Sequence, residues 1–254
     1  MSDGFPIVLT ADRTLTADYR LLFDGMLAAS QTTTAPPLLF ERLLMPSSRG
    51  SGVRTAVAPL GLRRIEAALL ASGFSPEAVV VASEGQLAAA IGRATRVIGV
   101  SSGEPMGLGM NSSTMTAIAG GQIYPEAMFR RLMRRIHRLN RNVSAKIVLG
   151  GPGAWQIAGD LRKCEELGVD HVITGYAEEN VAAVFRSLVR DEAVPQVVAG
   201  GWSPAVPIPP IRAASTMGVV EISRGCGLGC SFCTLSRVPM VHLPPKTILA
   251  DVET

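Results

Sequence analysis

The sequence is short of charged and aromatic side chains, and it holds no long uninterrupted apolar run. Charged residues make up 18% of the 254 residues and aromatic residues 5%, against 47% hydrophobic residues. This apolar composition excludes a disordered chain. A length of 254 residues is enough for one large or two modest globular domains. The longest apolar stretch, residues 78–92, is interrupted by Glu84 and Gln86 and falls short of the roughly 18 apolar residues of a membrane span. We therefore expect a soluble protein with no membrane span.

Neither sign of charge is in marked excess, and the chain starts without a basic leader. The net charge of +3 comes from 24 basic and 21 acidic residues, which is too little to imply a nucleic-acid partner. The arginine-rich stretch 129–141 carries apolar residues at helical spacing, which predicts a solvated face of a surface helix. Asp3 and the lack of a basic segment before an apolar core indicate no secretory signal, so we expect a cytoplasmic location.

Cysteine is scarce, but its distribution is uneven. Cys226, Cys230 and Cys233 fall within eight residues, and Cys164 stands alone. A disulfide framework would use paired, dispersed cysteines in a secreted chain. Three neighbouring thiols in a cytoplasmic chain indicate a metal centre instead. Cys164 lies among helix-forming residues and is predicted to be a small core side chain.

Short apolar runs alternate with amphipathic stretches from Arg54 onward. The predicted strands of this region cover residues 55–59, 78–83, 97–101, 146–149 and 171–174. They are apolar on both faces, as expected for a parallel sheet covered by helices on both sides. The sequence therefore predicts an α/β fold with a Rossmann-like (flavodoxin-like), doubly wound parallel sheet. A further apolar run, Ile7–Thr10, predicts a strand before this region.

Changes in composition suggest four segments. These are an N-terminal extension (1–52), the sheet domain (53–192), a proline-rich linker (193–215) and the start of a second domain (216–254). The linker holds several prolines that cannot continue a helix or a central strand. A buried strand is predicted directly after it, at residues 218–223.

Two loops at the predicted carboxyl ends of strands are rich in glycine. Ligands of doubly wound sheets bind beyond these ends. Residues 102–114 combine three glycines with several hydroxyl groups and could line a large neutral ligand. Residues 150–155 read GGPGAW, which allows close approach of a ligand to the backbone or is a tight strand-to-helix turn. Neither loop is a P-loop.

The cysteine cluster follows the strand predicted after the linker and has the spacing CxxxCxxC. Three thiolates fill three corners of an iron–sulfur cube and leave one iron open. Neighbouring glycines allow the loop to wrap an inorganic cluster, and Phe232 supplies an apolar wall. A zinc ion held by the three cysteines and His242 is the structural alternative, although these gaps do not match the usual zinc spacings.

This motif resembles the signature of the radical S-adenosylmethionine superfamily, in which an aromatic residue stands directly before the third cysteine. The surrounding EISRGC is similar to the subgroup that carries an N-terminal cobalamin-binding domain. The resemblance implies a 4Fe-4S cluster on Cys226, Cys230 and Cys233, with S-adenosylmethionine on the Phe232 side of the loop. It also implies that residues 216–254 contain the first β-strand and cluster loop of a partial TIM-type barrel, so that this domain is incomplete.

The sheet domain, in turn, resembles corrinoid-binding domains. By resemblance, the residues that would line cobalamin are Ser101, Ser102, Ser112, Ser113, Gly150, Gly151, Thr174 and Gly175. Gly150-Gly151 stand where the family has its Gly-Gly pair after the fourth strand, and 174–180 resembles the Gly-Glu-rich turn after the fifth. The family's DxHxxG motif is missing, and Ala58 stands where its axial histidine would be. The resemblance then implies a cobalt without a protein imidazole.

The resemblance implies a cobalamin-dependent radical enzyme of the methyltransferase class. Such an enzyme transfers a methyl group to an unactivated carbon, or rearranges a radical there, and the cofactors carry the chemistry. We expect a small-molecule, lipid or peptide substrate and a reductant such as ferredoxin or flavodoxin. We assign no catalytic residue, and we expect this chain alone to be inactive. The rival interpretation is a non-catalytic corrinoid- or nucleotide-binding module with a structural Cys3His metal site.

Overall fold

The structure is a computed structural model that describes residues 3–47, 52–231, 233, 236 and 238–254. Its centre is a six-stranded parallel sheet with the order β2-β1-β3-β4-β5-β6. The strands are β1 (Ile7–Ala11), β2 (Val79–Val81), β3 (Val97–Ser101), β4 (Lys146–Gly150), β5 (His171–Thr174) and β6 (Val197–Ala199). This architecture confirms the predicted α/β, Rossmann-like fold.

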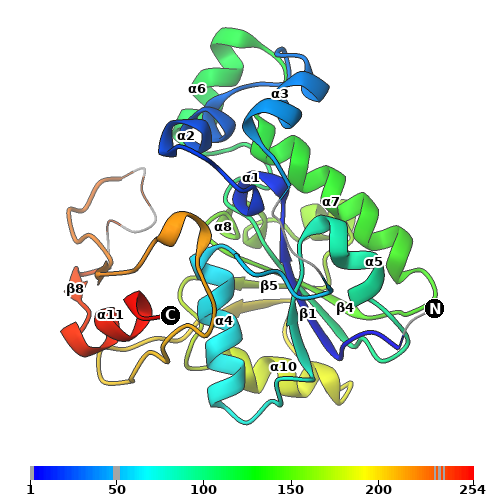
Figure 1. Cartoon of the computed structure of the whole chain (residues 1–254), viewed down its shortest axis with the longest axis vertical. Helices are drawn as coiled ribbons and strands as arrows, with labels where there is room; N and C mark the ends of the chain where they lie inside the picture. Colours follow the sequence, from blue (N-terminus) through cyan, green and yellow to red (C-terminus); the bar gives the residue numbers. More distant parts are fainter. Residues whose placement is uncertain (1–2, 48–51, 232, 234–235, 237) are drawn as a thin grey trace.

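Helices cover both faces of the sheet because successive side chains of each strand point to opposite sides. On β1, Val8 packs into one core and Ile7 and Leu9 into the other. The first face is covered by α5 (Leu87–Ala90), α7 (Tyr124–Asn140), α8 (Trp155–Ala158) and α9 (Leu161–Leu167), and the second by α4 (Leu60–Ala71) and α10 (Val181–Val189). Figure 1 shows these helices around the central strands.

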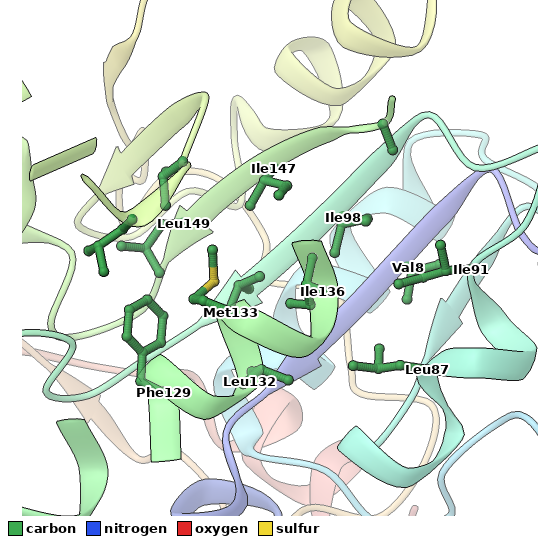
Figure 2. Packing of buried hydrophobic residues seen from close by; sticks show 14 of the residues in the cluster. Val8, Leu87, Ile91, Ile98, Phe129, Leu132, Met133, Ile136, Ile147 and Leu149 are labelled. Atoms are coloured by element: carbon green, nitrogen blue, oxygen red, sulfur yellow. The ribbon is translucent and has the colours of Figure 1, made fainter. Parts of the chain in front are cut away.

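Helix α7 supplies much of the first core. Phe129, Leu132 and Ile136 are fully buried against the strands, as Figure 2 shows. The arginines of the same helix lie outside this core, where Arg131 pairs with glutamates of other elements. The predicted division of this helix into an apolar and a charged face is confirmed. Cys164 is fully buried in the same core, also as predicted.

A third group of helices lies beyond the carboxyl end of β1 (Figure 1). It consists of α1 (Arg13–Thr16), α2 (Leu22–Ser30), α3 (Pro37–Leu44) and α6 (Met110–Ala119). Its small core joins the start of α7, where Tyr124 is fully buried and stacks on Phe40 with ring centroids 4.2 Å apart. Among the described residues no helix has both the length and the apolar character needed to cross a bilayer.

The strand predicted at residues 55–59 does not form. Within this segment only Ala58 makes a β-bridge, an isolated one to Ser215. The Arg63 guanidinium donates to the carbonyl groups of Thr55 and Ala56, and the Thr55 amide donates to the Val81 carbonyl of β2 over 2.9 Å. This backbone is therefore satisfied by separate contacts and not by a strand ladder. The first strand of the sheet is β1, which lies between β2 and β3. The sheet therefore begins well before the predicted boundary at residue 53.

The region after the sheet also differs from the prediction. The proline-rich segment 193–215 contains β6, which pairs only with β5 at the edge of the sheet, where a nearby proline is tolerated. Of the strand predicted at 218–223, only the end forms: β7 (Ser223–Arg224) pairs antiparallel with β8 (Val241–His242). The Ile222 carbonyl still accepts from the Leu243 amide over 2.9 Å, but residues 219–222 form no strand in the described part of the chain, and Ile222 is 60% exposed.

The remaining elements are the 3-10 turns η1 (Glu84–Gln86) and η2 (Thr216–Gly218) and the last helix, α11 (Pro245–Val252). Figure 1 shows α11 and β8 on the same side of the sheet as α4. The buried carboxylate of Asp251 in α11 pairs with Arg64 of α4. The last segment of the chain is thus attached to the sheet domain.

The core assignment predicts a large effect of truncating Phe129. Phe129→Ala should lower the free energy of unfolding by about 3–5 kcal/mol, because it removes a fully buried ring and leaves a cavity. The matched control is Arg134→Ala, at an exposed position of the same helix, which should change stability by less than about 0.5 kcal/mol. Urea unfolding measures both variants, and similar losses would contradict the assignment.

Candidate functional site

The ends of β3 and β4 bring four of the predicted residues together. Ser101 stands opposite Gly150 in the sheet register, and the Ser102 amide donates to the Gly150 carbonyl over 3.2 Å. A Cβ on Gly151 would lie 2.5 Å from the Ser101 Oγ, and the Gly151 φ is 91°. This glycine is therefore required by the packing of the β4 turn on the end of β3. The GGPGAW segment is a tight strand-to-helix turn.

The same edge of the sheet leaves room beside the backbone. A Cβ on Gly150 would meet no heavy atom closer than 3.9 Å, and one on Gly175 would meet none within 4 Å. Thr174 ends β5, and its carbonyl accepts from the Gly200 amide over 2.7 Å. The Ser102 Oγ is buried and has no hydrogen-bond partner among the described residues. These features fit a ligand that presents hydrogen-bonding groups to the carboxyl edge.

Ser112 and Ser113 lie elsewhere, in α6. The Ser113 hydroxyl donates to the Met110 carbonyl over 3.0 Å, and the Ser112 carbonyl accepts from Thr116 over 3.0 Å. Helix α6 packs on α2, in the group of helices beyond the sheet. The structure thus separates these two serines from the turn that Ser101 and Ser102 form with β4.

Asp12 is a polar residue of this edge that the sequence analysis missed. It directly follows β1, and its neighbour Ala11 stands opposite Ser101, so Asp12 and Ser102 lie at adjacent strand ends. Between β1 and β3 the strand order reverses, which is where doubly wound sheets bind ligands. The signal was present in the sequence, as an acidic residue immediately after an apolar run.

The carboxyl group of Asp12 is fully buried. Burial raises its pKa to about 6, although hydrogen bonds from Thr14 act in the opposite direction. One oxygen accepts from the Thr14 amide over 2.9 Å and from the Thr14 hydroxyl. The other oxygen has no partner among the described residues. Asp12 therefore sits at the switch point as a carboxyl group that gains or loses a proton near neutral pH.

The prediction for Ala58 depends on a strand at residues 55–59, which does not form. The sheet begins with β1, and the loop after it, Asp12–Ala17, reads DRTLTA and contains no histidine.

A cavity of about 330 Å³ lies next to this loop. One wall comes from the segment after β1 and the other from η2. The lining residues are Thr16, Ala17, Asp18, Tyr19, Val57, Ser215, Thr216, Met217 and Gly218. The cavity therefore lies between the sheet domain and the segment that leads to the cysteines.

The three clustered cysteines lie in one loop that is closed by hydrogen bonds. The Cys226 amide donates to the Val238 carbonyl over 2.8 Å. The Ser236 hydroxyl shares its one proton between the carbonyls of Cys230 and Cys233, each 2.7 Å away. The three thiols are free and half-buried. This donor set fits an iron–sulfur cluster that is reached from one side.

The described residues do not hold these thiols in a ligating arrangement. No group of three or more His, Cys, Asp or Glu side chains in the described part of the chain is placed to hold a metal ion. His242, the fourth ligand of the zinc alternative, is exposed on β8, opposite Ser223. Phe232 lies outside the described residues. Cluster binding would therefore require the three thiols to come closer together.

The burial of Asp12 predicts a pH-dependent stability. Its pKa rises from the ordinary 3.8 to about 6 in the folded protein, so its contribution is present below about pH 4 and lost as the pH rises through 6. Asp12→Asn keeps the oxygen that accepts from Thr14 but carries no charge. The variant should unfold at higher urea concentration than the parent near pH 8, by about 1–3 kcal/mol, and match it near pH 4.

Asp160→Asn is the control for this experiment. Asp160 caps α9 at the surface, and its hydrogen bond with Arg162 lowers its pKa. Asp160→Asn should therefore not raise the stability of the protein at high pH. A gain for Asp12→Asn that is the same at all pH values would show that the Asp12 carboxyl does not titrate as the burial indicates.

Comparisons with known proteins address the fold. No protein-family model matches the chain, and no curated protein matches it. Among solved structures, the chain is similar to the radical S-adenosylmethionine methyltransferase TsrM from Kitasatospora setae, solved with cobalamin and a [4Fe-4S] cluster. The TM-score is 0.55 at 15% identity, and the match covers 100% of this chain but only 45% of TsrM. The chain thus shares its fold with part of that protein and is a distant structural relative of it.

Proposed function

We propose that the protein serves in cobalamin-dependent radical S-adenosylmethionine chemistry of the methyltransferase class. The observation that carries the proposal is the place of the cysteine loop. Its first residue, Gly225, donates its amide to the Tyr176 hydroxyl over 3.4 Å, and Tyr176 belongs to the turn after β5. The loop therefore starts against the same edge of the sheet that carries the candidate cofactor residues.

Cys226, Cys230 and Cys233 would hold three irons of a 4Fe-4S cluster and leave the fourth open. Such a cluster, when bound, supplies the electron that cleaves S-adenosylmethionine reductively. The glycines that separate the cysteines adopt positive φ, 73° at Gly227 and 73° at Gly229, and so allow the loop to bend around a ligand. We place S-adenosylmethionine on the Phe232 side of this loop.

Cobalamin would lie along the carboxyl ends of β3, β4 and β5. Ser102 offers a free hydroxyl, and Gly150 and Gly175 leave space beside the backbone. Ser101 and Gly151 shape this surface through their mutual contact, and Thr174 forms its border at β5. Ser112 and Ser113 could reach the cofactor only from α6. The loop after β1, residues 12–17, contains no histidine, so it would leave cobalt without a protein imidazole.

The chain spans less than half of its structural neighbour, so the complete activity is part of the proposal. We propose a small-molecule, lipid or peptide substrate with an unactivated carbon that receives the methyl group or rearranges. Electrons would come from a carrier such as ferredoxin or flavodoxin. A cytoplasmic location would keep the three thiols reduced for cluster assembly.

Anaerobic reconstitution tests the cluster. The chain should take up iron and sulfide and gain the broad visible absorption of a 4Fe-4S centre, because three thiols of one loop are available. Cys226→Ala, Cys230→Ala and Cys233→Ala should each abolish this, because each removes one of the three thiolates that would ligate iron. Cys164→Ala is the matched control, since Cys164 is buried in the core, and it should keep the full iron content.

Two results would contradict the cluster assignment. One is full iron content in Cys230→Ala. The other is a stoichiometric zinc ion that is lost in both Cys230→Ala and His242→Ala, which would support the structural Cys3His site instead.

Titration with hydroxocobalamin tests the second cofactor. Ser102→Ala should weaken binding roughly 3- to 10-fold, as expected for the loss of one hydrogen bond. It is a cleaner variant than a bulky residue at Gly151, because the Ser102 hydroxyl has no partner in the described protein, whereas Gly151 is needed for packing. Ser113→Ala tests whether α6 takes part. Unchanged binding of hydroxocobalamin would show that α6 does not line the cofactor.

Spectroscopy of the same complex tests the absence of an axial histidine. The electron paramagnetic resonance spectrum of bound cob(II)alamin should show no hyperfine splitting from a protein imidazole. Such splitting, lost on substitution of one of the three histidines of the chain, would refute this part of the proposal.

A further inference from the structure

Arg224 directly precedes the cysteine loop, yet its side chain is buried to 1% exposure. The guanidinium donates two hydrogen bonds to the Glu221 carboxylate, from Nε over 2.8 Å and from Nη2 over 3.0 Å. Nη2 also donates to Glu178, which lies in the turn after β5. Burial acts to lower the pKa of Arg224, but these hydrogen bonds outweigh it and raise the pKa above its ordinary value. The group is therefore a permanent cation.

Two aromatic rings enclose the same guanidinium. Its central carbon lies 4.4 Å from the ring centroid of Tyr176 and 4.9 Å from that of Trp202. The two rings meet edge to face, with centroids 5.6 Å apart. The negative faces of aromatic rings attract a desolvated cation. The two rings and the two glutamates form a cage around Arg224. Tyr176 follows β5 and Trp202 follows β6, so this cage lies at the carboxyl edge of the sheet.

Buried charges connect the cage to α4 and α11. Glu221 also accepts from Arg64 of α4 over 3.3 Å. Arg64 in turn pairs with both oxygens of Asp251 in α11. One oxygen of Asp251 accepts from the Ile211 amide over 3.0 Å. The residues on both sides of Arg224 are thus tied to helices and turns that the sheet holds in place.

We infer that Arg224 is the positioning residue that fixes the start of the cysteine loop at the carboxyl edge of the sheet. The inference rests on the proposed function in that the loop is a cofactor site. Only Gly225 separates Arg224 from Cys226, so the cage determines where the first thiol lies relative to Thr174 and Gly175. Two cofactors that act on one substrate need a fixed relative placement, since small misplacements are costly to rate.

The chemistry of the cage requires arginine. A planar guanidinium binds a carboxylate with two parallel hydrogen bonds and stacks on aromatic faces at the same time, whereas a lysine ammonium keeps only the charge. Arg224→Lys therefore removes the geometry of the cage and leaves its charge balance unchanged.

Hydrogen exchange of the cluster-free chain tests the inference without any cofactor. In Arg224→Lys, the hydrogen-bonded amides of Gly225, Cys226 and Gly229 should exchange at least 10-fold faster than in the parent, because the loop start is released. Arg131→Lys is the matched control: Arg131 also joins two glutamates, but on α7, and its substitution should leave these amides unchanged. Equal exchange in Arg224→Lys and the parent would overturn the inference.

Tyr176→Phe keeps the test decisive if Arg224→Lys fails to fold. This variant retains the ring over Arg224 and removes only the hydroxyl that accepts from the Gly225 amide. Exchange should accelerate at the Gly225 and Cys226 amides and nowhere else in the loop. Acceleration spread over the whole sheet domain would instead show a general loss of stability and would overturn the positioning role.

Iron release from the reconstituted protein separates this inference from the proposed function. Arg224→Lys retains all three cysteines, so it should assemble a cluster but lose iron to a chelator several-fold faster than the parent. If the parent assembles no cluster, the proposed function fails while the exchange result still decides the cage. If both proteins hold iron equally and exchange alike, the positioning role is wrong.

Discussion

The pairing of β1 with β2 on one side and β3 on the other is the constraint on which the site depends. Parallel strands of one sheet end at the same edge, so the loops that follow β1, β3, β4 and β5 must meet there. The reversal of strand order beside β1 brings Asp12 next to Ser102. Packing on both faces leaves this edge as the place where polar groups can face a ligand.

A set of buried charges helps to attach the last segment to the sheet domain. Arg64, Glu221, Arg224, Glu178 and Asp251 form a connected set of charges whose side chains are at most 15% exposed. Buried ion pairs contribute little net stability because desolvation offsets their attraction. What they supply here is geometry, since a charge inside such a network has few alternative positions. This accounts for the short contacts of Arg224 with elements far apart in the sequence.

The sequence revealed those elements whose signal is local. Residues 97–101, 146–149 and 171–174 are apolar on both faces and form β3, β4 and β5. The arginine-rich helix and the buried Cys164 were also predicted, because helical periodicity suffices for both. Residues 55–59 have the composition of a strand, but Arg63 binds the carbonyls of Thr55 and Ala56 and no strand forms. No local pattern indicates this.

The candidate site could be predicted only where its signal is local in the sequence. The cysteine motif is contiguous and was visible, and so was the glycine pair after β4. The role of Asp12 depends on β1 joining strands from which it is separated by more than 60 residues. The cage depends on Tyr176 and Trp202 meeting Arg224 across the fold. Periodicity cannot predict contacts between such distant positions.

The cage of Arg224 constrains how this protein can change in evolution. Loss of Glu178 alone would leave a buried cation short of a partner, and loss of Arg224 alone would leave two buried carboxylates facing each other. Either single change is costly, whereas a joint replacement by apolar side chains could be tolerated. The residue before the first cysteine and the turn after β5 should therefore vary together among relatives, even though they are far apart in the sequence.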